Sequence, residues 1–148
     1  EIEVMWAPDP AADGAALRSA FGFHAVAVQT GATAGDRLAM AFSERFFFHR
    51  TEKIVAIGVD APAVPRELID HAFALLDSCE WVVGPAQNGG YYLIGSRAAT
   101  FDSDVFRGVG ESAALPAALE KVRTLENSIA LLPERISTTF FDGLRGSG

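Results

Sequence analysis

Apolar and polar positions alternate along the chain in a pattern that predicts strands separated by helices. The predicted strands are short apolar runs, at residues 2–6, 24–28, 54–59, 81–84, 91–94 and 129–132. The predicted helices repeat apolar residues every three or four positions, at residues 11–21, 37–48, 65–76 and 112–125. Residues 101–110 predict a loop or a short helix. This order of elements indicates an α/β fold with a mostly parallel or mixed Rossmann-like sheet flanked by helices.

Two details sharpen this prediction. The run from Ile54 to Val59 is almost continuously apolar, which is typical of a strand buried on both faces of a sheet. The helix at residues 37–48 places Leu38, Phe42 and Phe46 on one face, which predicts that this face packs on the sheet.

Composition supports a single domain with a well-filled core, since 49% of the 148 residues are apolar and 21% are charged. Twelve Lys and Arg residues against nineteen Asp and Glu residues give a net charge of −7, which excludes nucleic-acid binding through a basic patch.

No apolar run is long enough to span a membrane. The single cysteine, Cys79, cannot form an internal disulfide, and a reducing, cytoplasmic location is expected.

The first candidate site segment is Gly58-Val59-Asp60-Ala61-Pro62, at the end of the predicted buried strand. Ligands of open α/β sheets bind beyond the carboxyl ends of the strands. A carboxylate there suits Mg²⁺ or Mn²⁺ holding a diphosphate, with Asp60 as the metal ligand. The alternative is that Asp60 caps the following helix or closes a turn.

The second segment runs from Gly84 to Tyr92 and contains Asn88, Gly89 and Gly90. Adjacent glycines let a backbone approach a ligand closely and present N–H groups to it. Tyr91 and Tyr92 are expected on opposite faces of a strand, one lining a pocket and the other packing. An Asn-Gly β-hairpin is the alternative, and the pattern alone favours it.

The third segment runs from Gln29 and Gly31 to Arg37, between a strand and a helix. Free N–H groups at a helix start, together with Arg37, suit an anion. The sequence has neither the G-x-G-x-x-G nor the P-loop pattern, and an ordinary surface loop is the alternative.

Together, these segments resemble a bacterial family of small GT-A-fold proteins assigned as glycosyltransferases. The family is of the nucleotide-diphospho-sugar transferase type and is linked to arsenosugar biosynthesis or to radical-SAM and selenoprotein loci. The resemblance covers residues 29–95. It rests on Gln29 with the run 33–38, on Gly58 to Pro62, and on the long motif Gly84-Pro85-Ala86-Gln87-Asn88-Gly89-Gly90-Tyr91-Tyr92-Leu93-Ile94-Gly95.

The resemblance implies a metal-dependent transferase of a nucleotide-diphospho-sugar, with Asp60 and Asn88 as catalytic residues and Asp60 as the metal ligand. The residues that it implies for nucleotide or substrate binding are Gln29, Gly31, Arg37, Pro62, Gly89, Gly90, Tyr91 and Tyr92. Transfer of a nucleotidyl group is the related alternative.

The sequence also departs from the family pattern. Asn88 and Thr33 stand where acidic residues are expected, and residues 136–141 lack a carboxylate. The family's opening strand and basic glycine loop have no counterpart ahead of residues 2–6, so a single GT-A-like domain over residues 1–148 is expected to lack its first βα unit. The absence of acidic residues at Asn88, at Thr33 and in residues 136–141 favours a second hypothesis, a non-catalytic module that binds a nucleotide or sugar.

Overall fold

The computed structural model describes residues 3–6, 25–28, 30–58, 64–87, 89–106 and 114–135. Its strands are β1 (Glu3–Trp6), β2 (Ala25–Val28), β3 (Lys53–Ile57), β4 (Trp81–Pro85), β5 (Tyr91–Arg97) and β6 (Ile129–Leu131). Its helices are α2 (Ala34–Phe48), α3 (Arg66–Leu75) and α4 (Ala114–Thr124), with the short 3₁₀ helices η1 (Ala98–Thr100) and η2 (Ser103–Val105). Every predicted strand has its counterpart, whereas the predicted helix at residues 11–21 lies outside the described residues.

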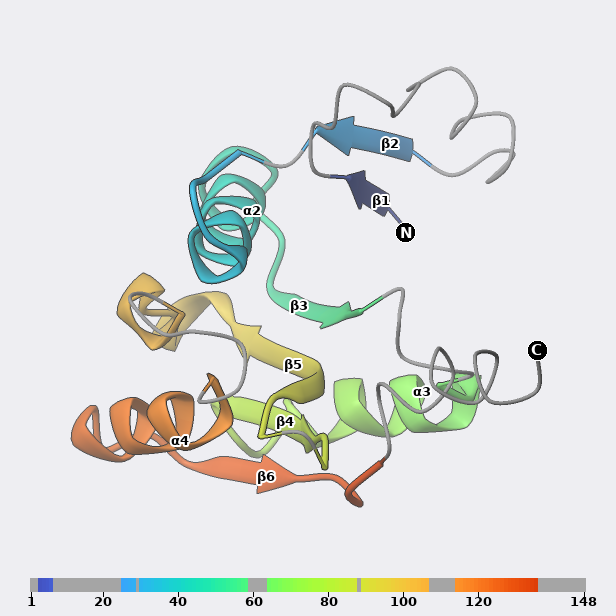
Figure 1. Ribbon diagram of the computed structural model, residues 1–148, viewed down its shortest axis with the longest axis vertical. Coiled ribbons are helices and arrows are strands. Elements are labelled where there is room, and N and C mark those ends of the chain that lie inside the picture. Colours follow the sequence, from blue (N-terminus) through green and yellow to red (C-terminus); the bar gives the residue numbers. More distant parts are fainter. Residues whose placement is uncertain are drawn as a thin grey trace, which may run out of the picture.

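The strands form two sheets (Figure 1). One contains β1 and β2 in parallel, and the other has the order β3-β5-β4-β6. Strand β5 runs antiparallel to both β3 and β4, while β4 and β6 are parallel. The α/β prediction is therefore confirmed in its mixed form, and the expectation of a mostly parallel sheet is wrong for the four-stranded sheet. The predicted β-hairpin is confirmed, because β4 and β5 are consecutive antiparallel neighbours.

Helices α2 and α4 cover one face of the four-stranded sheet (Figure 1). Their apolar sides meet Trp81, Val83 and Ile94 of the sheet, and Phe106 closes the cluster from the end of η2. Phe42 of α2 is 1% exposed and packs edge-on against Phe106, with 5.1 Å between the ring centroids. The predicted apolar stripe of α2 thus faces the sheet, because aromatic rings bury the most apolar surface there.

Helix α3 covers the opposite face (Figure 1). Ala72 and Leu76 pack there against Val82 and Leu93 of the sheet and against Leu132. Val82 and its neighbour Val83 belong to different clusters, as the alternation of side chains along a strand requires. The sheet is therefore the middle layer between two apolar layers.

Strand β3 departs from its prediction. It lies at the edge of the four-stranded sheet, and none of its five residues is fully buried. Ile57 is 46% exposed. The expected burial on both faces is therefore wrong for this structure. An apolar run shows that a strand is suited to burial. It does not show whether a neighbouring strand is present to cover it.

Candidate functional site

The carboxyl ends of three strands meet at one edge of the four-stranded sheet. Strands β3 and β4 both run antiparallel to β5, and β6 runs parallel to β4. Strands β3, β4 and β6 therefore point the same way, and their carboxyl ends lie at a common edge. Ligands of such sheets bind at this edge.

The first and second sequence segments are joined at this edge by the backbone. The N–H group of Gly58 donates a hydrogen bond to the carbonyl oxygen of Tyr92 at 3.3 Å, directly after Ile57 has paired with Leu93. Gly58 opens the segment that contains Asp60, and Tyr92 follows the two glycines of the long motif. Asp60 and Pro62 themselves lie outside the described residues.

The glycine loop between β4 and β5 is closed by its own hydrogen bonds. The amide of Ala86 donates to the carbonyl oxygen of Gly90 at 2.9 Å, and the amide of Gly89 donates to that of Ala86 at 3.3 Å. Gly89 has a φ of +88°, a conformation that favours glycine. Its carbonyl oxygen accepts from Leu115, at the start of α4, at 3.1 Å. The Gly89 amide is thus engaged within the loop, whereas it was expected to face a ligand; Asn88 lies outside the described residues.

Tyr91 and Tyr92 pack on opposite faces of the sheet, as predicted. Tyr91 packs against the cluster under α2 and α4, where burial raises its pKa to about 12. Tyr92 is 2% exposed and belongs to the cluster under α3. Both rings pack in the core, so the expectation that one of them lines a pocket is not supported.

The start of α2 differs from the predicted anion site. The amide of Asp36 donates to Oγ1 of Thr33 at 3.1 Å, and the amide of Thr33 donates to Oδ2 of Asp36 at 3.2 Å. This capping box satisfies helix-start amides and adds a carboxylate. Both effects disfavour an anion at this position.

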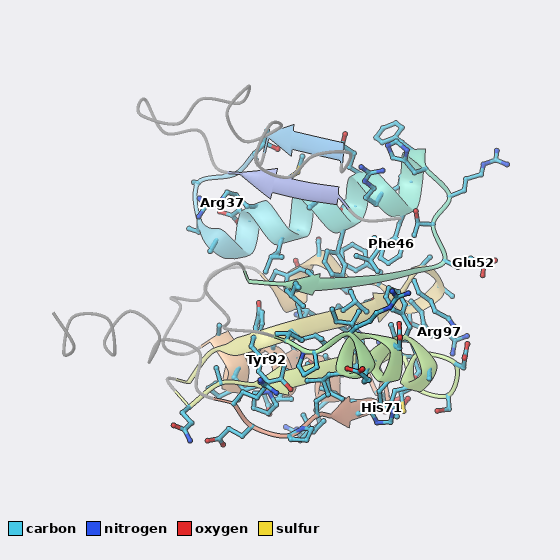
Figure 2. The ribbon with its side chains drawn as sticks, turned by 90° about the vertical axis from the view of Figure 1, so that its right-hand side faces the viewer. Arg37, Phe46, Glu52, His71, Tyr92 and Arg97 are labelled. Carbon is cyan, nitrogen blue, oxygen red and sulfur yellow. The ribbon has the colours of Figure 1, made fainter. Side chains whose placement is uncertain are left out.

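Gly31 and Arg37 are held close to this cap. Gly31 has a φ of +137°, and a Cβ there would lie 2.7 Å from the backbone nitrogen of Arg37. The Arg37 amide donates to the carbonyl oxygen of Thr33 at 3.0 Å. Figure 2 shows the Arg37 side chain at one end of α2. The β3 arrow points toward this end, so Arg37 lies on the same side of the molecule as the carboxyl ends of the strands. Gln29 lies outside the described residues.

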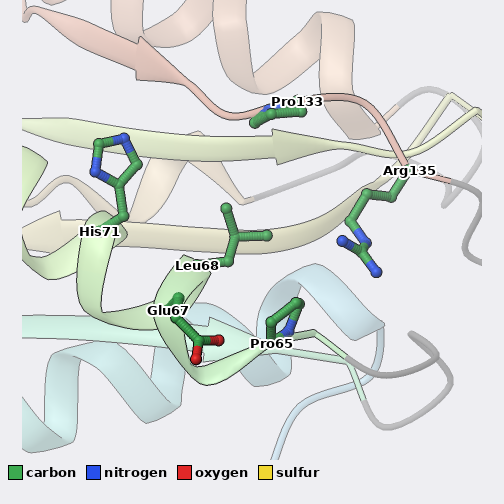
Figure 3. A pocket seen from close by; sticks show the side chains of 6 residues that line it. All are labelled: Pro65, Glu67, Leu68, His71, Pro133 and Arg135. Carbon is green, nitrogen blue, oxygen red and sulfur yellow. The ribbon is translucent and has the colours of Figure 1, made fainter.

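A hollow of about 430 Å³ lies beside the amino end of α3 (Figure 3). Its lining residues come from α3, from the residue that precedes it and from the chain after β6: Pro65, Glu67, Leu68, His71, Pro133 and Arg135. The guanidinium of Arg135 lies 5.9 Å from the ring centroid of Tyr92. Sequence reasoning did not include Arg135, although its position just after the last strand is a signal that the edge rule provides.

The described residues contain no group of three or more His, Cys, Asp or Glu side chains able to hold a metal ion. They therefore do not by themselves fit a Mg²⁺ or Mn²⁺ site, and the metal prediction depends on Asp60. Within the same part of the chain, no helix is long and apolar enough to cross a membrane.

Comparison with known proteins identifies the family. The model of the DUF2064 family, described as an uncharacterized protein conserved in bacteria, matches residues 1–113. A crystal structure from Desulfovibrio desulfuricans G20, described as a "putative nucleotide-diphospho-sugar transferase", superposes with a TM-score of 0.84 at 31% sequence identity. The match covers 92% of this chain and 61% of that one, so this chain spans less than two thirds of the solved relative. No curated protein matches.

These matches confirm the resemblance seen in the motifs and the GT-A-like fold expected from it. The mixed sheet with helices on both faces is the fold of a nucleotide-diphospho-sugar transferase. The chain belongs to the DUF2064 family of bacterial proteins.

Proposed function

We propose that this protein is a transferase that binds a nucleotide-diphospho-sugar and transfers the sugar to an acceptor. The observation that carries the proposal is the hydrogen bond between the Gly58 amide and the Tyr92 carbonyl oxygen. It joins Gly58, two residues before Asp60 in the sequence, to the strand that follows the glycine loop, at the carboxyl edge of the sheet, where α/β proteins bind ligands. The description of the Desulfovibrio relative supports the same class of substrate.

In this proposal, Asp60 and Asn88 carry the chemistry. Mg²⁺ or Mn²⁺ bound at Asp60 would neutralise the charge that develops on the leaving diphosphate. Contacts to the nucleotide sugar are proposed for Gln29, Gly31, Arg37, Pro62 and Gly90. The packed rings of Tyr91 and Tyr92 would act by fixing the glycine loop, since both are held in the apolar layers. Because the chain has a net charge of −7, few of its own groups can balance the charge of a diphosphate, and a bound cation would do so.

Calorimetry tests the proposal directly, with UDP-, GDP- and ADP-sugars titrated in the presence and absence of Mg²⁺ or Mn²⁺. Metal-dependent binding that Asp60→Ala abolishes is expected. Asp77→Ala is the matched control, because Asp77 pairs with Lys53 at the opposite end of β3 and should leave binding unchanged. If no nucleotide sugar binds at millimolar concentration, the proposal fails.

The product distinguishes two kinds of transfer. Transfer of a sugar releases a nucleoside diphosphate, whereas making the nucleotide sugar from a sugar phosphate and a nucleoside triphosphate releases pyrophosphate. Chromatography of the nucleotides, together with a pyrophosphate assay, therefore separates glycosyl transfer from the nucleotidyl alternative.

A second candidate function is a binding module of the same fold without turnover. The absence of an acidic or histidine cluster among the described residues favours it, as does the amide Asn88 in place of an acid. This candidate predicts nucleotide binding that persists in EDTA and yields no product. Release of nucleoside diphosphate with any acceptor would exclude it.

A further inference from the structure

The hollow beside α3 borders the same edge of the sheet as the candidate site. Arg135, in one of its walls, pairs with Ala86, the residue that follows β4. Pro65, in the other wall, directly precedes α3 on the chain after β3. The volume of about 430 Å³ lies within the usual range for a small-molecule site, roughly 300 to 1,000 Å³. The hollow is therefore large enough to hold a substrate next to the carboxyl ends of the strands.

The backbone of Arg135 is fixed by the long motif that contains the glycine loop. Its amide donates a hydrogen bond to the carbonyl oxygen of Pro85 at 3.0 Å, and its carbonyl oxygen accepts one from the amide of Gln87 at 3.0 Å. These two bonds form the parallel bridge between Arg135 and Ala86. The side chain of Arg135 therefore starts from a backbone position that the motif itself determines.

The side chain of Arg135 is positioned by Tyr92. The guanidinium carbon lies over the Tyr92 ring, and the buried ring is held in turn by the hydrogen bond from its hydroxyl group to Pro133. A guanidinium over a ring contacts it through its flat face, whereas its five N–H groups lie along its edges. Figure 3 shows the Arg135 side chain extending toward Pro65, at the end of the hollow away from His71. A cation is thus held at one end of the hollow.

The other lining residues set the charge that the hollow can accept. Leu68 and the two prolines are apolar, and Glu67 and His71, four residues apart, lie on the same side of α3. With His71 neutral, the charges of Arg135 and Glu67 balance. One guanidinium matches one carboxylate, whereas the second charge of a dianion would lack a partner and be repelled by Glu67. The lining thus favours a ligand with an apolar body and a single negative charge.

We propose that the hollow binds the acceptor of the transfer and that this acceptor is a small hydroxy acid with an apolar body, an inference that rests on the proposed function. The carboxylate of the acceptor pairs with the guanidinium of Arg135 through two parallel hydrogen bonds, the geometry that arginine favours. Its apolar body lies against Leu68 and the two prolines. Its hydroxyl group donates a hydrogen bond to the carboxylate of Glu67.

The transfer balances with these groups. The hydroxyl oxygen of the acceptor forms a bond to the anomeric carbon of the donor sugar as the bond from that carbon to the diphosphate breaks. The electron pair of the broken bond leaves with the nucleoside diphosphate. The hydroxyl proton passes to the carboxylate of Glu67, which is exposed and returns it to water. Arg135 takes no part in the bond changes and determines which acceptor is bound.

Calorimetry without any nucleotide tests the hollow as a binding site, with 3-phenyllactate and 4-hydroxyphenylacetate as probes. Both acids should bind, whereas their methyl esters, and phenyl phosphate as a dianion, should bind at least about tenfold more weakly. Arg135→Gln should weaken the acids by a similar factor. Arg66→Gln is the matched control, because Arg66 starts α3, pairs with Asp70 and does not line the hollow.

Three results would overturn the site: no binding of either acid at millimolar concentration, esters that bind as tightly as the acids, or phenyl phosphate that binds more tightly. Because Arg135 also contacts Tyr92, circular dichroism checks that Arg135→Gln is folded. The comparison of acid with ester uses the unmodified protein, so it tests the negative charge of the ligand even if that variant unfolds.

The acceptor role is tested with the nucleotide sugar and metal that the calorimetry of the proposed function selects. The acids should bind equally well when the nucleotide sugar is bound, and at least one of them should stimulate release of nucleoside diphosphate. Glu67→Gln should leave the affinity for the acids within about twofold but slow the stimulated release by about a hundredfold, since an amide accepts a hydrogen bond but not a proton.

Competition between acid and nucleotide sugar, or stimulation by neither acid, would overturn the acceptor assignment. An unchanged rate in Glu67→Gln would overturn the role of Glu67. If the acids bind through Arg135 while no nucleotide sugar binds, the proposed function fails and the acid site remains. The two failures are therefore distinguishable.

Discussion

The hydroxyl group of Tyr92 donates a hydrogen bond to the carbonyl oxygen of Pro133 at 2.9 Å. This bond joins β5 to the chain that follows β6, across β4, which lies between them in the sheet. It therefore fixes one wall of the hollow beside α3, which Pro133 and Arg135 line.

Replacing Tyr92 by phenylalanine should lower the free energy of unfolding by about 1 kcal/mol, the usual net value of such a bond when its acceptor becomes unpaired. Urea unfolding measures the change. Tyr91→Phe is the matched control, because no described residue accepts a hydrogen bond from the Tyr91 hydroxyl, and it should cost clearly less. Equal losses in both variants would contradict the assigned role of the Tyr92–Pro133 bond.

Tyr91 makes stability sensitive to alkaline pH. Burial raises its pKa from 10.0 to about 12 in the folded protein. Between these two values the unfolded chain loses a proton that the folded protein keeps, so the free energy of unfolding should fall as pH rises. Below pH 10.0 Tyr91 is protonated in both states, so its contribution to the free energy of unfolding is fully present there. Between the two pKa values, the free energy of unfolding falls by at most about 1.4 kcal/mol per pH unit.

Urea unfolding at a series of pH values across this window measures the slope. The Tyr91→Phe variant should lose the part of the slope that belongs to Tyr91. A wild-type slope that persists unchanged in this variant would assign the alkaline sensitivity to another group.

Thr33 is predicted to stabilise α2 through its capping box with Asp36. Thr33→Ala should reduce the free energy of unfolding by about 1 kcal/mol, since an amide in the first helical turn loses its partner. Thr33→Ser keeps the hydroxyl and should restore most of the loss. Thermal unfolding followed by circular dichroism compares the three proteins, and an alanine variant as stable as the serine variant would exclude the cap.

The same residue illustrates what the sequence can predict. The 3.6-residue periodicity of Leu38, Phe42 and Phe46 correctly predicted α2 and its buried face, because a helix pattern is local. Thr33 looked like a missing acid when compared with a family motif, yet its position three residues before Asp36 is a capping signal that the chain itself carries. The helix start was therefore predictable, although the comparison with a motif hid it.

The partners of strands were less predictable, because pairing is not local. The Asn88-Gly89 turn correctly predicted that β4 and β5 form a hairpin. Nothing in the run from Ile54 to Ile57 specified that β5 is its one strand partner within the part of the chain that the structure describes. The contact between Gly58 and Tyr92, which joins two motifs of the candidate site, depends on that pairing and could not be derived from either motif.

Gly84 is predicted to be a position where even one methyl group is too large. A Cβ there would lie 2.6 Å from Cε2 of the Tyr92 ring. The ring is 2% exposed and is held by Pro133 at its hydroxyl and by Arg135 over its face, so it has little room to move away. Gly84→Ala should therefore cost about 1 to 3 kcal/mol in the free energy of unfolding, as overpacking in a dense core does.

A double-mutant cycle checks this cause. Because Tyr92→Ala removes the ring that obstructs the added methyl group, Gly84→Ala should cost much less in the Tyr92→Ala background than in the wild type, with a coupling of about 1 kcal/mol or more. Urea unfolding of the four proteins gives the coupling energy. Additive losses would mean that the cost at Gly84 arises from its backbone rather than from the ring, since the two residues would then act independently.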